Sequence, residues 1–95
     1  MLIVIFRATL KQVDAEYSEM AQRLRDLALK EFGCLEFHAV CEGNQEVALS
    51  WWPDAESIHR WRKHPEHARA QQLGREKWYA SYSVEIARSE RCYRR

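Results

Sequence analysis

The chain has 95 residues, and its 15 Lys and Arg against 14 Asp and Glu give a formal net charge of +1. Its composition, 46% hydrophobic and 31% charged, is typical of one small globular domain over residues 1–95 and excludes disorder and low complexity. The near-neutral charge argues against binding to nucleic acid. The longest apolar run, residues 1–6, is too short for the ~20 residues that span a bilayer, and it does not resemble a signal peptide. We therefore expect a cytoplasmic protein that binds neither nucleic acid nor a membrane.

The first part of the chain predicts a strand and then a helix. Leu2–Phe6 is a β-branched and aromatic run, which is typical of a strand. Because the run does not alternate with polar residues, both of its faces should be buried. Asp14 is the expected cap of a helix of roughly 18 residues, in which apolar side chains recur every three or four positions. Gly33 stands where a glycine commonly ends a helix.

Two more strands follow, over Cys34–Glu42 and Glu46–Trp52, and a turn at Gly43 joins them. In the first of these, residues 35, 37 and 39 should lie on one face and residues 34, 36 and 38 on the other. Trp51 and Trp52 are adjacent, so they should point to opposite faces of the sheet. Two large aromatic side chains on opposite faces again predict a sheet that is covered on both sides.

The last part of the chain predicts a divided helix and a final strand. Asp54 follows Pro53 and should begin a short helix that contains Trp61. The pair His64-Pro65 breaks this helix, because a residue before proline disfavours helical geometry. Pro65 then opens a second helix, which should run to about Trp78. Residues 82, 84 and 86 are apolar and alternate with smaller or polar residues, which predicts the last strand.

This order of elements predicts an α+β fold of the ferredoxin-like βαββαβ type, with a split second helix and an antiparallel sheet. Helices would cover one face of the sheet, and a domain of this size has nothing left to cover the other. A second copy packed sheet to sheet would bury that face. We therefore expect a symmetric homodimer.

Aromatic and histidine side chains are concentrated in the second half of the chain. His67 and Gln71 are four residues apart and share a helix face, and Trp61 lies on the preceding helix near the same corner. A pocket between the helices and the sheet, walled by Trp side chains and floored by Phe6, would suit a flat aromatic ligand. The alternative is that these aromatic side chains form only the hydrophobic core.

The histidines and cysteines predict no metal site and no disulfide framework. Pro65 interrupts the cluster of His59, His64 and His67, and no Cys or paired carboxylate completes a known ligand spacing. The three cysteines are odd in number and have no metal-like spacing. His38 differs because it lies beside Glu36 in a predicted strand. This pair would serve either as a buried acid and base or as a hydrogen-bonded pair across strands or across a dimer interface.

Three segments resemble the antibiotic-biosynthesis-monooxygenase family, whose members are dimeric α/β barrels. They are Gly33-Cys34-Leu35-Glu36-Phe37, Ser50-Trp51-Trp52-Pro53-Asp54, and Trp61 followed by His64-Pro65-Glu66-His67. The resemblance covers nearly the whole chain. It implies a pocket between helices and sheet in each subunit. The family includes oxygenases of polyphenols and quinols that need no cofactor, and enzymes that bind haem and degrade it.

The resemblance also bears on the choice between these two activities. The haem-degrading branch uses an Asn on the first strand and a Trp and a His on the helices. Trp61 matches that Trp, but Phe6 stands at the Asn position and Gln71 at the His position. We therefore expect a monooxygenase that acts on a quinol or polyphenol without a metal, flavin or other cofactor. The alternatives are a non-enzymatic dimer that binds a small ligand and a haem-degrading monooxygenase.

The residues expected to act in this chemistry follow from the same pattern. His67 is the candidate catalytic base, because the positive end of the helix dipole in the first helical turn should keep its imidazole neutral. The candidate substrate-binding residues are Phe6, His38, Trp52, Trp61 and Gln71.

Overall fold

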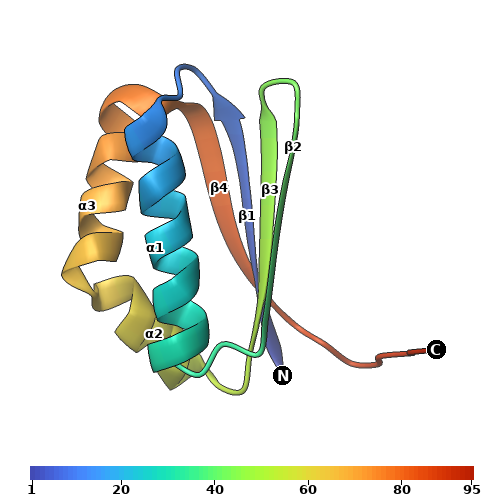
Figure 1. Ribbon diagram of the computed structural model, residues 1–95. Coiled ribbons are helices and arrows are strands. Elements are labelled where there is room, and N and C mark those ends of the chain that lie inside the picture. Colours follow the sequence, from blue (N-terminus) through green and yellow to red (C-terminus); the bar gives the residue numbers. More distant parts are fainter.

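The computed structural model describes residues 1–95 and consists of one sheet with its helices packed on one side (Figure 1). The elements in chain order are β1 (Leu2–Leu10), α1 (Ala15–Glu31), β2 (Glu36–Glu42), β3 (Gln45–Trp52), α2 (Ala55–Lys63), α3 (Pro65–Leu73), the π-helical turn η1 (Gly74–Trp78) and β4 (Tyr79–Arg88). All neighbouring strands are antiparallel, in the order β2-β3-β1-β4. The predicted ferredoxin-like α+β fold with a split second helix is confirmed.

Short side chains fix the helix ends where the sequence predicts them. Asp14 accepts a hydrogen bond from the backbone N–H of Tyr17 at 2.9 Å and begins α1. Asp54 accepts one from the backbone N–H of Ser57 at 2.8 Å and begins α2. Gly33 follows α1 with φ of 81°, a left-handed conformation that favours glycine. These contacts satisfy N–H groups that a helix start otherwise leaves unpaired.

The second helical region differs from the prediction at its end. His64 is extended (φ −59°, ψ 138°) and separates α2 from α3, as expected from Pro65. The expected helix to Trp78 is α-helical only as far as Leu73 and continues as the π-helical turn η1. A Cβ atom on Gly74 would lie 2.5 Å from the ring of Tyr79. Glycine therefore lets this ring pack directly against the backbone of η1.

The strands also differ in length from the prediction. β1 reaches Leu10 rather than Phe6, because it pairs with both β3 and β4 along its length. β2 begins at Glu36, so Cys34 lies outside the strand and is buried in the core, where its N–H donates to the Ala28 carbonyl. The prediction that Cys34 shares a sheet face with His38 is therefore wrong, because strand alternation starts two residues later.

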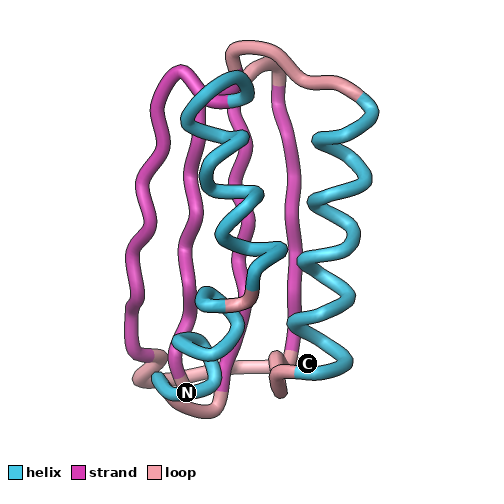
Figure 2. Tube along the Cα trace, turned by 90° about the vertical axis from the view of Figure 1, so that its left-hand side faces the viewer, coloured by secondary structure: helices cyan, strands magenta, loops and turns pink.

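The two faces of the sheet have different surroundings. The face under the helices contains Val4, Trp52 and, from the helices, Ile58 and Trp61 in one buried cluster. The other face carries no helix (Figures 1 and 2). Its register brings together five partly exposed apolar side chains, namely Ile3, Ile5, Val47, Leu49 and Trp51. We call this set the open face. Trp51 and Trp52 thus point to opposite faces, as predicted.

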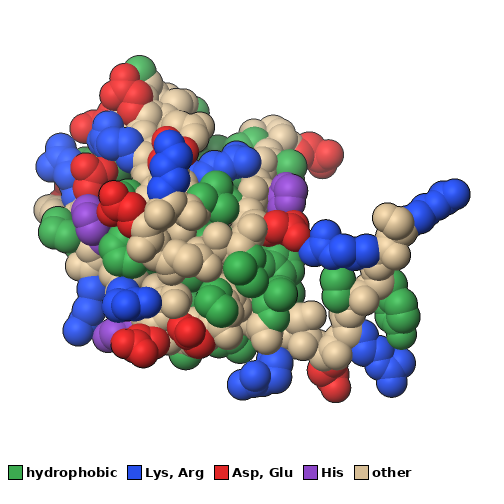
Figure 3. Space-filling model, turned by 60° about the horizontal axis from the view of Figure 1, so that its bottom comes forward, with side chains coloured by type: hydrophobic (Ala, Val, Ile, Leu, Met, Phe, Trp, Pro, Cys, Tyr) green, Lys and Arg blue, Asp and Glu red, His purple; other side chains and the backbone are tan.

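Residues 89–95 have no regular secondary structure and stand away from the body, where basic side chains are prominent (Figures 1 and 3). Arg94 in this tail contacts the Glu36 carboxylate at 2.6 Å. None of the helices is long and apolar enough to cross a lipid bilayer.

Candidate functional site

A mostly apolar cavity of about 240 Å³ lies between the sheet and the helices. All four strands contribute to its floor, and α1 and α3 form much of its roof. Apolar walls of this kind suit a flat, uncharged ring, and a few polar groups would fix how the ring is oriented. The cavity lies where the sequence predicts a pocket.

His67 provides a polar atom at one part of this wall. Its ring stands edge-on to Trp61, with 4.4 Å between the ring centroids. Its Nδ1 atom is buried and has no hydrogen-bond partner. Burial, with a smaller contribution from the positive charges of Arg62 and His64, lowers the pKa of His67 to about 4. The imidazole is therefore neutral at pH 7, but burial is the main cause rather than the helix dipole.

Trp61 is held rigidly beside His67. Its indole N–H donates to the backbone carbonyl of Leu24 at 3.1 Å. Its ring packs on Trp52 with a centroid separation of 5.1 Å and on the edge of Phe37 at 6.2 Å. A side chain fixed on several sides presents a preorganised apolar surface to a ligand.

Phe6 lies in the floor of the cavity. Its ring contacts Tyr79 and Tyr82, with centroid separations of 5.3 Å and 6.1 Å. Gln71 lines the same cavity one helical turn after His67. The structure thus brings together four of the predicted site residues, which are Phe6, Trp61, His67 and Gln71.

Trp52 and His38 lie outside the cavity, in contrast to the predicted roles. Trp52 is fully buried (0% exposed) and donates to Ser50 Oγ at 2.8 Å, so it supports the wall from behind. The His38 side chain is 63% exposed on the opposite face of the sheet, 3.2 Å from Glu36. His38 and Glu36 therefore do not form a buried acid and base. They lie at the margin of the open face, so the predicted alternative of a hydrogen-bonded pair at a dimer interface stays a prediction.

Sequence reasoning missed a second polar pair in the cavity, Tyr17 and Glu46. The hydroxyl of Tyr17 donates to the carboxylate of Glu46. Glu46 is only 8% exposed, and burial raises its pKa while the bond from Tyr17 opposes that rise. Burial and the neighbouring carboxylate raise the pKa of Tyr17. The sequence did hold a signal for a buried Glu46. It is an even number of residues from Trp52 on the same strand, so the two side chains lie on one face of the sheet.

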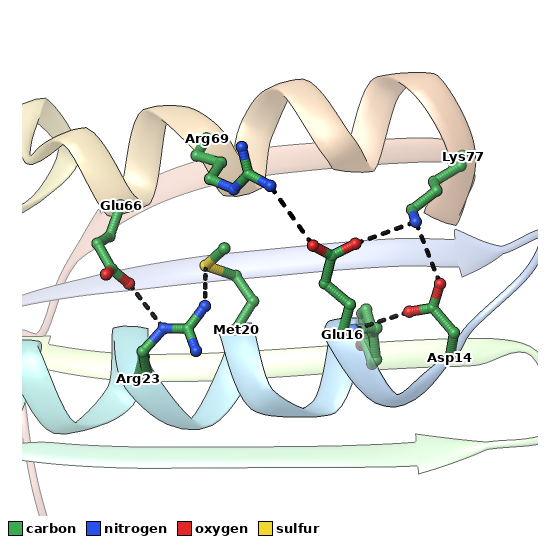
Figure 4. Close-up of polar contacts among 8 residues, drawn as sticks. Asp14, Glu16, Met20, Arg23, Glu66, Arg69 and Lys77 are labelled. Atoms are coloured by element: carbon green, nitrogen blue, oxygen red, sulfur yellow. Dashed lines mark hydrogen bonds and ion pairs between the residues drawn. The ribbon is translucent and has the colours of Figure 1, made fainter.

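Ion pairs connect α1 to α3 and η1 above the cavity (Figure 4). Arg23 contacts Glu66 at 2.9 Å, while Glu16 contacts Lys77 at 3.1 Å and Arg69 at 3.5 Å. These partners are well exposed, so each pair contributes little to stability on its own. Together they fix the register of the two helices that roof the cavity.

No three side chains of His, Cys, Asp or Glu lie close enough together to hold a metal ion. Polar groups that line the cavity include His67, Gln71, Arg62 and the pair of Tyr17 and Glu46.

Comparison with known proteins agrees with this architecture. Residues 1–73 match the model of the antibiotic biosynthesis monooxygenase family. The chain belongs to this family. One relative, the uncharacterized protein YqjZ of Bacillus subtilis strain 168, is 36% identical over 89 residues, which cover 93% of this chain and 78% of YqjZ.

Solved structures of family-like proteins share the fold at low sequence identity. A mutant of SnoaB from Streptomyces nogalater, a cofactor-independent oxygenase, has a TM-score of 0.79 at 16% identity, covering 96% of this chain and 94% of SnoaB. A conserved protein from Methanosarcina mazei Go1 has a TM-score of 0.79 at 19% identity, covering 94% and 92% of the two chains. At these identities the likeness shows the fold alone.

Proposed function

We propose that this family member is a cofactor-independent monooxygenase that oxidises a small quinol or polyphenol in the cavity beneath α1 and α3. The observation that carries the proposal is the imidazole of His67, which lines the mostly apolar cavity beside Trp61 and has a buried Nδ1 atom without a hydrogen-bond partner. A buried nitrogen without a partner is costly unless a ligand supplies one. A phenolic hydroxyl would supply that partner and would also donate the proton that the chemistry must remove.

In the proposed reaction, His67 Nδ1 takes the phenolic proton, and the resulting phenolate gives one electron to dioxygen. The resulting phenoxyl radical, whose unpaired electron is shared with the ring carbons, combines with superoxide to form a carbon–oxygen bond on the ring. The peroxide oxygen receives the proton back from the imidazolium. Loss of the ring hydrogen and cleavage of the O–O bond then release water and leave a quinone, so that one oxygen atom enters the product and one leaves as water. In an empty cavity the pKa of His67 is low because nothing offsets the imidazolium charge, whereas a phenolate beside it would stabilise that charge.

The apolar walls support the same chemistry. Trp61 and Phe6 provide flat surfaces on which an aromatic ring packs. A ring in the cavity displaces water, and a dry site strengthens the attraction between phenolate and imidazolium. Gln71, one turn along α3, can orient a second polar group of the substrate.

We also propose that the protein acts as a homodimer joined through the open face. This surface gathers Ile3, Ile5, Leu49 and Trp51 on the side of the sheet that carries no helix. A contiguous apolar surface of this kind marks an association site. Because the face is covered by neither helices nor loops of the same chain, a second copy is the partner that restores two-sided burial.

Oxygen uptake with a panel of hydroquinones and polyphenols tests the proposal, with metal-free protein and with and without added haem. We expect uptake that needs no added cofactor. Trp61→Ala should weaken binding of an active substrate about tenfold, because it removes the wall on which the ring packs. Binding without oxygen uptake across the panel would instead favour a non-enzymatic ligand-binding dimer, and uptake only with haem would favour the haem-degrading alternative.

A further inference from the structure

Glu46 is a buried carboxylate that the proposed reaction does not use. It lies on β3 opposite Ala8 of β1 and Cys41 of β2, with its side chain toward the helices. Its hydrogen bond from the Tyr17 hydroxyl is the one polar side-chain contact it makes. No Lys, Arg or His pairs with it, although ion pairs are frequent among the exposed carboxylates nearby.

A buried carboxylate with a single hydrogen bond is under-satisfied. An ionised carboxylate has two oxygens and about four acceptor positions, and Tyr17 occupies one of them. The oxygen that Tyr17 does not contact makes no hydrogen bond within the chain. Because Glu46 lines the cavity, a ligand there can donate a hydrogen bond to it.

The space beside Glu46 admits a ligand. Ala48 follows it on the same face of β3, and Ala39 of β2 is the register partner of Ala48. Both side chains are small and line the cavity. The Phe6 ring, whose strand position pairs with Ala48, and Tyr79 provide aromatic surfaces near this small-residue floor.

Glu46 lies at a different part of the cavity from His67. Trp61, which contacts His67, packs on Trp52, and Trp52 in turn donates to Ser50. Ser50 lies four positions after Glu46 on β3, which corresponds to about 13 Å along an extended strand. Glu46 on β3 and His67 on α3 thus contribute polar groups to the cavity from different elements.

We propose that Glu46, held in place by Tyr17, is a second polar subsite of this cavity and binds a phenolic hydroxyl of the aromatic ligand as a hydrogen-bond acceptor. The inference deepens the proposed function and rests on the same cavity, but it concerns binding and does not depend on catalysis by His67. It adds a requirement to the substrate class, namely a hydroxyl that can donate to Glu46.

Calorimetric titration with two matched probes tests this subsite without any reaction. The probes are 2-naphthol and 2-methoxynaphthalene, which share a ring system but differ in the hydrogen that Glu46 would accept. Wild-type protein should bind 2-naphthol about tenfold or more tightly than 2-methoxynaphthalene, since a hydrogen bond to a charged group is at stake. Glu46→Leu should abolish this preference, and Glu46→Gln, which keeps the shape but loses the charge, should reduce it severalfold.

Two controls make the result specific. Glu19→Gln changes an exposed carboxylate of α1 outside the cavity and should leave the preference unchanged. His67→Ala is the second control, because it separates a hydroxyl bound by His67 from one bound by Glu46, and a failed oxygenase mechanism would leave this binding test intact. Equal affinity of wild-type protein for both probes, or no binding of either at millimolar concentration, would overturn the subsite. So would a preference that survives in both folded Glu46 variants but disappears in His67→Ala.

Discussion

At the scale of single residues, the low pKa of His67 links the cavity to the stability of the whole fold. Above about pH 6.5 the imidazole is neutral in both the folded and the unfolded chain, so it contributes nothing to the pH dependence. Below pH 6.5 the unfolded chain takes up a proton that the folded chain, with a pKa of about 4, refuses. Folding is therefore destabilised progressively from about pH 6.5 down to about pH 4, by up to about 3 kcal/mol.

This linkage predicts that His67→Gln flattens the acid limb of the stability curve. Urea unfolding at pH 7.5 and pH 4.5 should show a large loss of stability for wild-type protein and a smaller loss for the variant. The carboxylates titrate equally in both proteins, so the difference between the two losses isolates His67. Identical losses would show that His67 is accessible to protons in the folded state.

A second prediction at this scale concerns Gly74. A Cβ at this position would overlap the Tyr79 ring at 2.5 Å, and that ring is packed against Phe6 and Tyr17. Gly74→Ala should therefore displace Tyr79 and cost about 1–3 kcal/mol, as overpacking usually does. Thermal unfolding measures the loss. In a protein that already carries Tyr79→Ala, Gly74→Ala should cost much less stability, because the ring that it would overlap is gone. Equal losses with and without the Tyr79 ring would contradict the contact.

At the scale of elements, Asp14 acts both as the cap of α1 and as a partner of Lys77, at 3.2 Å. Asp14→Ala should lower the melting temperature by a few degrees, because it removes both contacts. Asp14→Asn keeps a side-chain acceptor for the Tyr17 N–H and loses only the charge, so its melting temperature should stay close to that of wild-type protein. Equal losses in the two variants would assign the effect to the ion pair with Lys77 rather than to the cap.

The sequence was sufficient for the elements whose signals are local. Asp14, Gly33, Asp54 and the His64-Pro65 pair act on their own neighbours, and each lies where it was expected. The π-helical turn was missed because the apolar periodicity of the helix carries no sign of the close approach between Gly74 and the Tyr79 ring. The start of β2 was predicted two residues too early for a similar reason. Cys34 is buried beside Ala28 of α1, a contact between elements that strand alternation does not reveal.

In the candidate site, too, features that depend on spacing within one element were predicted, and contacts between elements were not. Helical spacing placed His67 and Gln71 together, and the split helix placed Trp61 near them. Strand alternation correctly placed Trp51 and Trp52 on opposite faces, but it does not reveal that Trp61 covers Trp52. Strand alternation also placed His38 opposite Phe37 and Ala39, as the structure has it, but it did not show that the helices cover only the face of Phe37 and Ala39. Glu46 and Tyr17 were missed because their partnership joins β3 to α1, and their roles in binding stay predictions.

At the scale of the whole molecule, the open face predicts a dimer of about twice the 11.4 kDa chain mass. Leu49→Lys places a charge within this apolar surface and should shift the protein to a monomer, because burying an unpaired charge is costly. Leu29→Lys makes the same change on the outer side of α1 and should leave the dimer intact. Sedimentation at micromolar concentration measures both, and a monomeric wild-type protein would contradict the assembly.

The central claim is that the cavity oxidises an aromatic substrate with His67 as its base. The most direct test is the rate of oxygen uptake by His67→Ala, measured with the best substrate of the panel and together with its Kd. Removing a general base should lower the rate about 100-fold or more while the Kd changes little. Full activity in a folded His67→Ala variant would contradict the claim.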